Sequence, residues 1–188
     1  YMAALMTSVL DSSVKISAYI AECRECGIAL LPPDINHSED HFSVEEGGIR
    51  FGLGAVKNIG RGLIRSMATK RREGGPFRSL QDFLERMDDG ELNKRAVENL
   101  IRCGAMDSLG CHRSELIGVY DAMMDSISSS RKKNLEGQLG LFSMLEDDSA
   151  AKMDIPKRAE FDKAELMAME KETTGIYLSG HPMDDYRK

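Results

Sequence analysis

No apolar run in this sequence approaches the roughly 20 residues that a membrane-spanning helix needs. The longest run, residues 27–31, ends at Pro32 and Pro33. The sequence also does not begin with the charged, apolar and small-residue order of a secretory signal. We therefore expect a cytoplasmic protein with no membrane partner, whose four cysteines are free thiols.

Motifs of the common catalytic and metal centres are also absent. Two-metal nucleotidyl transfer needs clustered carboxylates, often as Asp-x-Asp, and no Asp-x-Asp occurs. There is no Walker-type phosphate loop and no nucleophile elbow. Cys23 and Cys26 form one Cys-x-x-Cys, but a zinc ribbon needs a second pair, and Cys103 and Cys111 are too far apart. We expect no catalytic residue, metal site or cofactor in this chain, and Cys23 and Cys26 a turn apart on a helix.

Charge is abundant but unevenly distributed. The formal net charge of −6 argues against a generic basic nucleic-acid-binding protein. Between Arg50 and Arg72, however, there are seven basic residues and no acidic one, while acids collect at 82–91 and 146–148. Phosphate binding needs only one basic face. A solvated helix face is the alternative, and charge alone does not decide between them.

Hydrophobic periodicity predicts a mainly α-helical fold with one small β-hairpin. Apolar residues alternate with polar ones at 42–44 and 49–51 around a Glu-Glu-Gly-Gly turn, which predicts the hairpin. The serine-rich basic stretch 126–133 is interpreted as the start of a linker. Helices are expected at residues 2–10, 13–26, 55–58, 63–70, 79–87, 93–103, 113–124 and 158–170.

Two segments have the form of helix, tight turn, helix. In the first, glycine in the turn lets backbone N–H groups approach a phosphate, and the positive end of the following helix faces the same phosphate. Ile59 is expected to pack back between the helices. Such a site would hold duplex DNA regardless of sequence, and plain packing is the alternative. Its candidate DNA-binding residues are Lys57, Asn58, Ile59, Gly60, Arg61 and Arg65.

The second segment joins a helix at 95–102 to a helix at 113–124. Ala105 and Met106 are expected to pack into the core between its two helices, and fewer charged residues surround this turn than the first one. Packing against the first segment is the role that its sequence favours by itself. Its candidate DNA-binding residues are Gly104, Ala105 and Arg113.

An apolar island, Gln-Leu-Gly-Leu-Phe, interrupts the expected linker at 138–142. Exposed adjacent leucine and phenylalanine cost solubility unless they dock somewhere. Burial of Leu141 and Phe142 would contribute roughly 1.5–3 kcal/mol each, and the Gln138 amide would fix the register. Docking on a partner and folding back onto the chain's own core both agree with the pattern.

Several strings, taken in order, resemble the α subunits of bacterial DNA polymerase III, a family of replicative DNA polymerases. They cover nearly the whole chain and are Leu-Leu-Pro-Pro-Asp-Ile-Asn at 30–36, Ile-Arg-Phe-Gly-Leu-Gly-Ala-Val-Lys at 49–57, Gly-Pro-Phe-Arg-Ser-Leu at 75–80, Leu-Asn-Lys-Arg at 92–95, Leu-Ile-Arg-Cys-Gly-Ala-Met-Asp at 100–107 and Tyr-Leu-Ser-Gly-His-Pro at 177–182.

The resemblance implies four parts. Residues 1–36 would end a fingers domain, and 37–127 would form a tandem helix-hairpin-helix domain that holds duplex DNA. Residues 128–152 would be a linker with a clamp-binding motif, and 153–188 a helical segment leading to an oligonucleotide-binding domain outside this chain. The motif that resembles the family's sliding-clamp motif consists of Gln138, Leu139, Leu141 and Phe142.

The resemblance also implies what the intact protein does. It would carry out template-directed DNA synthesis with magnesium held by palm carboxylates that this chain lacks, so this fragment would be inactive alone. Its partners would be duplex DNA, the sliding clamp and other holoenzyme subunits. The family usually has glycine where Asn58 stands, but asparagine tolerates the left-handed conformation that such a turn needs.

Two other classes of protein have the same features. One is an interaction module that binds only the clamp, with the basic stretch as a solvated surface. The other is a repair or recombination protein that uses the same hairpins.

Overall fold

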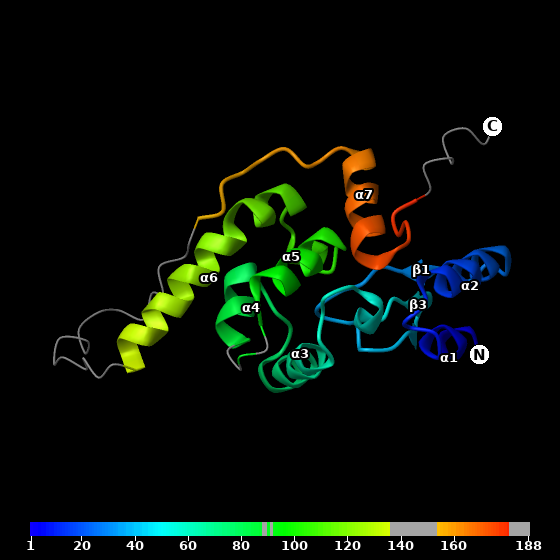
Figure 1. Cartoon of the computed structure of the whole chain (residues 1–188), viewed down its shortest axis with the longest axis horizontal. Coiled ribbons are helices and arrows are strands. Elements are labelled where there is room, and N and C mark those ends of the chain that lie inside the picture. The colour runs from blue at the N-terminus through cyan, green and yellow to red at the C-terminus, as the bar shows by residue number, and fades with distance from the viewer. Residues whose placement is uncertain (88–89, 91, 136–153, 181–188) are drawn as a thin grey trace.

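The computed structural model describes residues 1–87, 90, 92–135 and 154–180, with the backbone alone for 131–135. The described chain is mainly helical with one small sheet, as the sequence predicts. Figure 1 shows the sheet and helices α1 and α2 at one end, α3 to α6 at the other, and α7 above the region where the two meet. Within the described residues, no helix is both long and apolar enough to cross a membrane.

The N-terminal part consists of α1 (Met2–Thr7), α2 (Ser13–Glu25) and the sheet. Ser12 caps α2, because its hydroxyl accepts a hydrogen bond from the Lys15 N–H. The expected hairpin is confirmed as β2 (Ser43–Glu45) and β3 (Gly48–Arg50). A third strand, β1 (Leu30–Leu31), pairs in parallel with β3 and gives the sheet order β1-β3-β2.

The central helices follow the predicted pattern with one correction. They are α3 (Arg61–Gly74), α4 (Leu80–Arg86) and α5 (Lys94–Arg102), and the Ser79 and Asn93 side chains cap α4 and α5. The helix expected at 55–58 is wrong. A 3-10 turn, η1 (Leu53–Ala55), lies there instead, because Val56 is extended and Asn58 is left-handed.

The C-terminal helices begin or end later than the sequence suggested. Helix α6 (Arg113–Leu135) follows the 3-10 turn η2 (Asp107–Leu109) and continues through 126–133, so the linker start expected there is wrong. That stretch contains no glycine or proline to end a helix, and its lysines and arginine favour helix. Helix α7 (Lys163–Thr174) begins at a capping box of Asp162 and Glu165, five residues after the predicted start.

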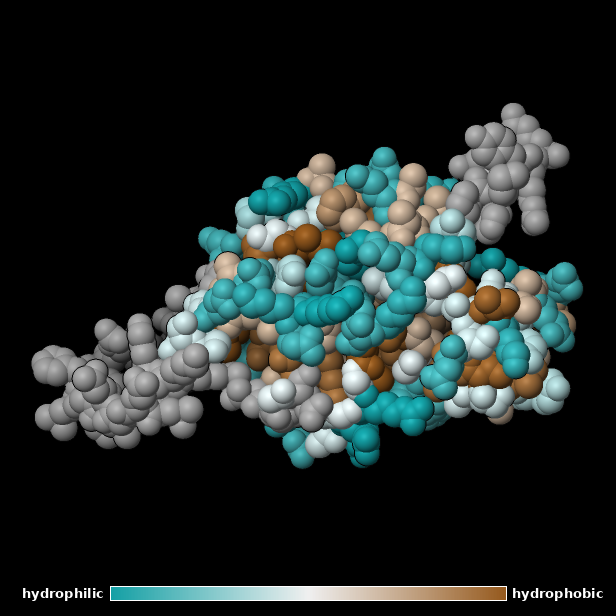
Figure 2. Space-filling model, in the orientation of Figure 1, coloured by the Kyte–Doolittle hydropathy of each residue, from teal (hydrophilic) through white to brown (hydrophobic). Residues whose placement is uncertain are grey.

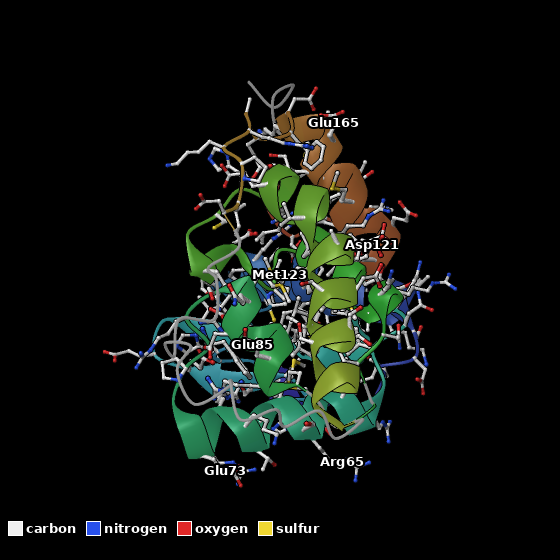
Figure 3. The ribbon with its side chains drawn as sticks, turned by 90° about the vertical axis from the view of Figure 1, so that its left-hand side faces the viewer. Arg65, Glu73, Glu85, Asp121, Met123 and Glu165 are labelled. Atoms are coloured by element: carbon white, nitrogen blue, oxygen red, sulfur yellow. The ribbon has the colours of Figure 1, made fainter. Side chains whose placement is uncertain are left out.

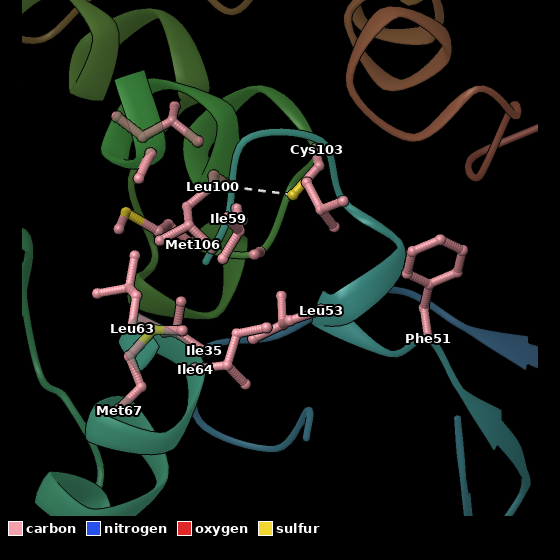
Figure 4. Packing of buried hydrophobic residues seen from close by; sticks show 14 of the residues in the cluster. Ile35, Phe51, Leu53, Ile59, Leu63, Ile64, Met67, Leu100, Cys103 and Met106 are labelled. Atoms are coloured by element: carbon pink, nitrogen blue, oxygen red, sulfur yellow. Dashed lines mark hydrogen bonds between the residues drawn. The ribbon is translucent and has the colours of Figure 1, made fainter. Parts of the chain in front are cut away.

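One hydrophobic core connects the two ends of the molecule. Ile35 and Phe51 enter it from the N-terminal part, Leu63 and Leu100 from α3 and α5, and Met106 from the turn after α5. Figure 4 shows Ile35, Leu63, Leu100 and Met106 close to one another and Phe51 to one side, near the strands. The Cys103 Sγ–H donates to the Leu100 carbonyl. Burial of a shared core holds the two helix-hairpin-helix segments at a fixed distance from each other.

We predict that Leu100→Ala lowers the free energy of unfolding by about 2–5 kcal/mol, because Leu100 is fully buried and its removal leaves a cavity. Urea denaturation monitored by circular dichroism measures this change. The control is Val44→Ala, since Val44 is 75% exposed and its loss should change stability little. Equal midpoints for the two variants would show that the core does not pass through Leu100.

Candidate nucleic-acid interface

The first hairpin presents an open helix N-terminus. Asn58 has φ 61°, so asparagine does take the left-handed conformation predicted for it. Ile59 is buried beneath the turn. Gly60 precedes α3 in an extended conformation, and no side chain caps the helix. A Cβ built on Gly60 would meet no atom within 4 Å. No side chain therefore takes the first N–H groups of α3, where the positive end of the helix dipole lies.

The seven basic residues between Arg50 and Arg72 divide into two groups. Some are used internally: the Arg50 guanidinium bonds Glu45 and the Pro32 carbonyl, and that of Arg71 bonds Glu39 and two backbone carbonyls. Arg61 and Arg65 are exposed on the first turns of α3. Figure 3 shows Arg65 on the outer side of α3, far from Glu165 at the start of α7. The basic stretch is therefore partly structural and partly a free cationic surface.

Lys57 has a structural role as well as a charge. Its backbone N–H donates to the Thr173 carbonyl at 2.8 Å, and its Nζ donates to the Glu172 carbonyl at 2.8 Å. Its own carbonyl accepts from Asn99 Nδ2 at 2.6 Å. The first hairpin is thus fixed between α5 and the C-terminal end of α7. The negative end of a helix is a favourable place for the ammonium group.

A polar cavity of about 360 Å³ adjoins the turn between α5 and α7. Lys57 and Asn58 line one side, and Arg95 and Arg102 of α5 line another. The Arg102 guanidinium is paired with Glu98 and Glu172, whereas Arg95 is exposed. Arg95 was not a candidate from sequence, because nothing in the sequence brings a residue 38 positions away beside Lys57. Its position extends the cationic surface of the first hairpin.

The second hairpin has the expected turn and core plug. Gly104 has φ 83°, and Ala105 and Met106 are fully buried. The Ala105 carbonyl accepts the Ile35 N–H at 2.8 Å, which ties this turn to the N-terminal part. Burial raises the pKa of the Cys103 thiol to about 12, so this thiol is inert at neutral pH. Gly104 and Ala105 therefore face the interior of the fold.

The Arg113 guanidinium is directed inward. Its side chain is only 9% exposed and bonds Asp107 from Nη2 at 2.7 Å and Glu170 of α7 from Nη1 at 3.2 Å. Burial acts to lower the pKa of Arg113, but Asp107 and Glu170 outweigh it and raise that pKa. The second oxygen of the buried Glu170 accepts the N–H groups of Leu178 and Ser179. Arg113 thus has a structural role, which joins α6 to α7.

A carboxylate already occupies the start of α6. Glu160 accepts the backbone N–H groups of Arg113 at 2.8 Å and Ser114 at 3.1 Å. Partial burial acts to raise the pKa of Glu160, but hydrogen bonds from the N–H groups of Phe161, Arg113 and Ser114 hold it below the usual value. The two hairpins therefore differ: α3 begins at open space, and α6 begins at a carboxylate.

Three expectations from the sequence concern features other than the two hairpins: the clamp motif, the Cys-x-x-Cys pair and a metal site. Gln138, Leu139, Leu141 and Phe142 lie outside the described residues. Cys23 is buried and Cys26 is exposed at the end of α2. In the part of the chain that the structure describes, no group of three or more His, Cys, Asp or Glu side chains is arranged to hold a metal ion.

Comparison with known proteins supports the assignment of the hairpins. Residues 27–116 match a family model described as a helix-hairpin-helix motif. DNA polymerase III subunit alpha of Mycobacterium tuberculosis is 39% identical over 98% of this chain, that of Vibrio cholerae 36% over 100%, and that of Thermus aquaticus 38% over 99%. This chain belongs to the DNA polymerase III α-subunit family. It spans only 15–16% of the length of these relatives.

Both turns lie within the region that matches the helix-hairpin-helix family model, the open one at Gly60 and the one at Gly104. An α-subunit segment with two such turns has two places where a phosphate could lie against a helix. The geometry described above distinguishes them.

We predict that Arg113→Ala lowers the free energy of unfolding by roughly 3–5 kcal/mol, because it leaves the Glu170 carboxylate buried without its partner. Chemical denaturation measures the change. The matched control is Arg61→Ala, which removes an exposed arginine and should cost little. If Arg113→Ala were as stable as the control, the guanidinium would be free for another role.

Proposed function

We propose that this chain is a part of a replicative DNA polymerase that holds duplex DNA independently of its sequence, through the first hairpin, whose turn joins η1 to α3. The observation that carries the proposal is the uncapped start of α3 at Gly60, beside the exposed Arg61 and Arg65. Backbone N–H groups at a helix N-terminus bind a phosphate without reading a base. The family to which the chain belongs supports DNA as the source of that phosphate.

The surrounding charges favour the same role for this surface. Arg65, Arg61 and Arg95 are exposed on α3 and on the start of α5, while the net charge of the chain is −6. The space-filling view in Figure 2 shows hydrophilic side chains over much of the visible face, with hydrophobic patches between them. A locally cationic surface on an acidic protein would give weak, salt-sensitive binding that depends on few phosphate contacts.

We predict that the double variant Arg61→Ala/Arg65→Ala binds duplex DNA more weakly and with a flatter salt dependence. Each lost phosphate contact should reduce the slope of log K against log salt by about 0.9. Lys57 is left intact because it holds α7. Fluorescence anisotropy with two duplexes of unrelated sequence, over a range of salt concentrations, measures both quantities.

The matched control for this test is Lys15→Ala/Arg24→Ala, which removes two exposed cations from α2. It changes the net charge equally but lies at the other end of the molecule (Figure 1). The control should keep the wild-type slope. If the two double variants had equal slopes of log K against log salt, the first hairpin would be excluded as the phosphate site.

Tethering to the sliding clamp is a second, independent part of the proposal. The string Gln138–Phe142 combines an amide with two large apolar side chains in a polar context. Docked as an extended peptide, Leu141 and Phe142 would fill an apolar pocket on the clamp, and Gln138 would bond through its amide. We expect such a segment to bind with an affinity near micromolar, about −8 kcal/mol.

We predict that Leu141→Ala/Phe142→Ala abolishes clamp binding and leaves the melting temperature unchanged. Loss of both side chains removes roughly 3–5 kcal/mol of apolar contact. Titration with purified clamp, beside thermal melting, measures the two effects. Unchanged clamp binding would disprove the docking, and early melting would show that the two residues belong to the chain's own core.

The intact protein would use these contacts during template-directed DNA synthesis, with other holoenzyme subunits as further partners. Magnesium and the carboxylates that hold it would then belong to parts of the protein outside this chain, whose own sequence has no Asp-x-Asp. The role of residues 1–188 would be to position the duplex and to keep it near the clamp.

A further inference from the structure

The start of α6 is the position where the second hairpin would receive a DNA phosphate. It is filled by the Glu160 carboxylate, which accepts the Arg113 N–H on Oε2 and the Ser114 N–H on Oε1. These are the N–H groups that an anion at a helix N-terminus uses. A third N–H, from Phe161, satisfies Oε1 further. The carboxylate therefore has the hydrogen-bond partners that a phosphate oxygen would take.

The segment around Glu160 is held by further bonds to the same turn of α6. The Ser114 hydroxyl donates to the Ala159 carbonyl at 2.8 Å. The Arg158 N–H donates to Glu115 at 3.2 Å, and the His112 ring nitrogen Nδ1 lies 2.9 Å from the Arg158 carbonyl. The contact is thus a built interface between the chain before α7 and the second hairpin, formed by backbone and side chains together.

The local charge also disfavours DNA at this turn. Asp107 and Glu170 pair with the Arg113 guanidinium, and Glu115 and Glu160 accept backbone N–H groups at the same turn. The nearby cations are Lys157, which acts on Glu115, and Arg158, which lies against α6 at Gly118. A duplex phosphate would meet this excess of negative charge, whereas at the first hairpin it would meet exposed arginines. Glu160 belongs to the same chain as α6, so a DNA phosphate would have to displace an intramolecular ligand, which binds without the cost of bringing two molecules together.

We propose that Glu160 is a built-in anion that closes the second hairpin to DNA phosphates and turns it into the docking site for the segment that carries α7. The two hairpins then have different ligands, a phosphate for the first and a carboxylate of the same chain for the second. α7 in turn fixes Lys57 through the Glu172 and Thr173 carbonyls. This inference rests on the proposed function only where it names DNA as the excluded anion.

The test uses inorganic phosphate as the anion, added at constant ionic strength to the 15N-labelled chain. In the wild type, the amide resonances of Arg113 and Ser114 should not move. In Glu160→Ala, which vacates the site, they should move and saturate. The control Glu46→Ala removes an exposed carboxylate with the same change in net charge and should behave as the wild type.

Two results would overturn the proposal: movement of these resonances in the wild type, or no movement in a folded Glu160→Ala. If Glu160→Ala does not fold, acid titration of the wild type replaces it. The Arg113, Ser114 and Phe161 amides should then shift together, with one midpoint below the usual pKa of a glutamate carboxyl. Unrelated midpoints would also overturn it. Because phosphate replaces DNA, failure of this test is distinct from failure of DNA binding at the first hairpin.

Discussion

The Arg113 guanidinium, held between Asp107 and Glu170, is the interaction on which the arrangement of the C-terminal half depends. It is buried, so its charge has to be paired within the protein. Glu170 lies in α7 and also binds the N–H groups of Leu178 and Ser179, so one ion pair fixes both the helix and the chain after it. A buried pair of this kind adds little net stability over apolar packing, but it is costly to break and it specifies one arrangement.

The consequence of that arrangement appears at the other hairpin. With α7 joined to the start of α6 through Arg113, its last carbonyls accept hydrogen bonds from Lys57, and Asn99 of α5 donates to the Lys57 carbonyl. The first turn is therefore supported from two sides, while its outer side, at Gly60, stays open. A rigid turn with an open helix N-terminus loses little conformational entropy when a phosphate binds. The second hairpin thus serves the first by positioning it, and its own anion position is filled by Glu160.

Sequence reasoning anticipated the parts of this account that depend on local chemistry. Glycine at 60 and 104 and the buried residues Ile59, Ala105 and Met106 follow from which residues suit a turn or a core. What it missed depends on contacts between distant residues. Glu160 lies 47 positions after Arg113, and Arg95 lies 38 after Lys57, so no periodicity marks either pairing. Likewise, Arg113 at the start of a helix has the sequence context of a phosphate contact, and only its burial distinguishes the two roles.

The central claim is that duplex DNA is bound at the start of α3 and not at the start of α6. Amide chemical-shift mapping of the wild-type chain with a short duplex tests it most directly. The account predicts the largest shifts at Arg61, Gly62 and Leu63, the N–H groups left without partners in the first turn of α3, with Arg113 and Ser114 unmoved. Largest shifts at Arg113 and Ser114, with the α3 amides unmoved, would contradict it.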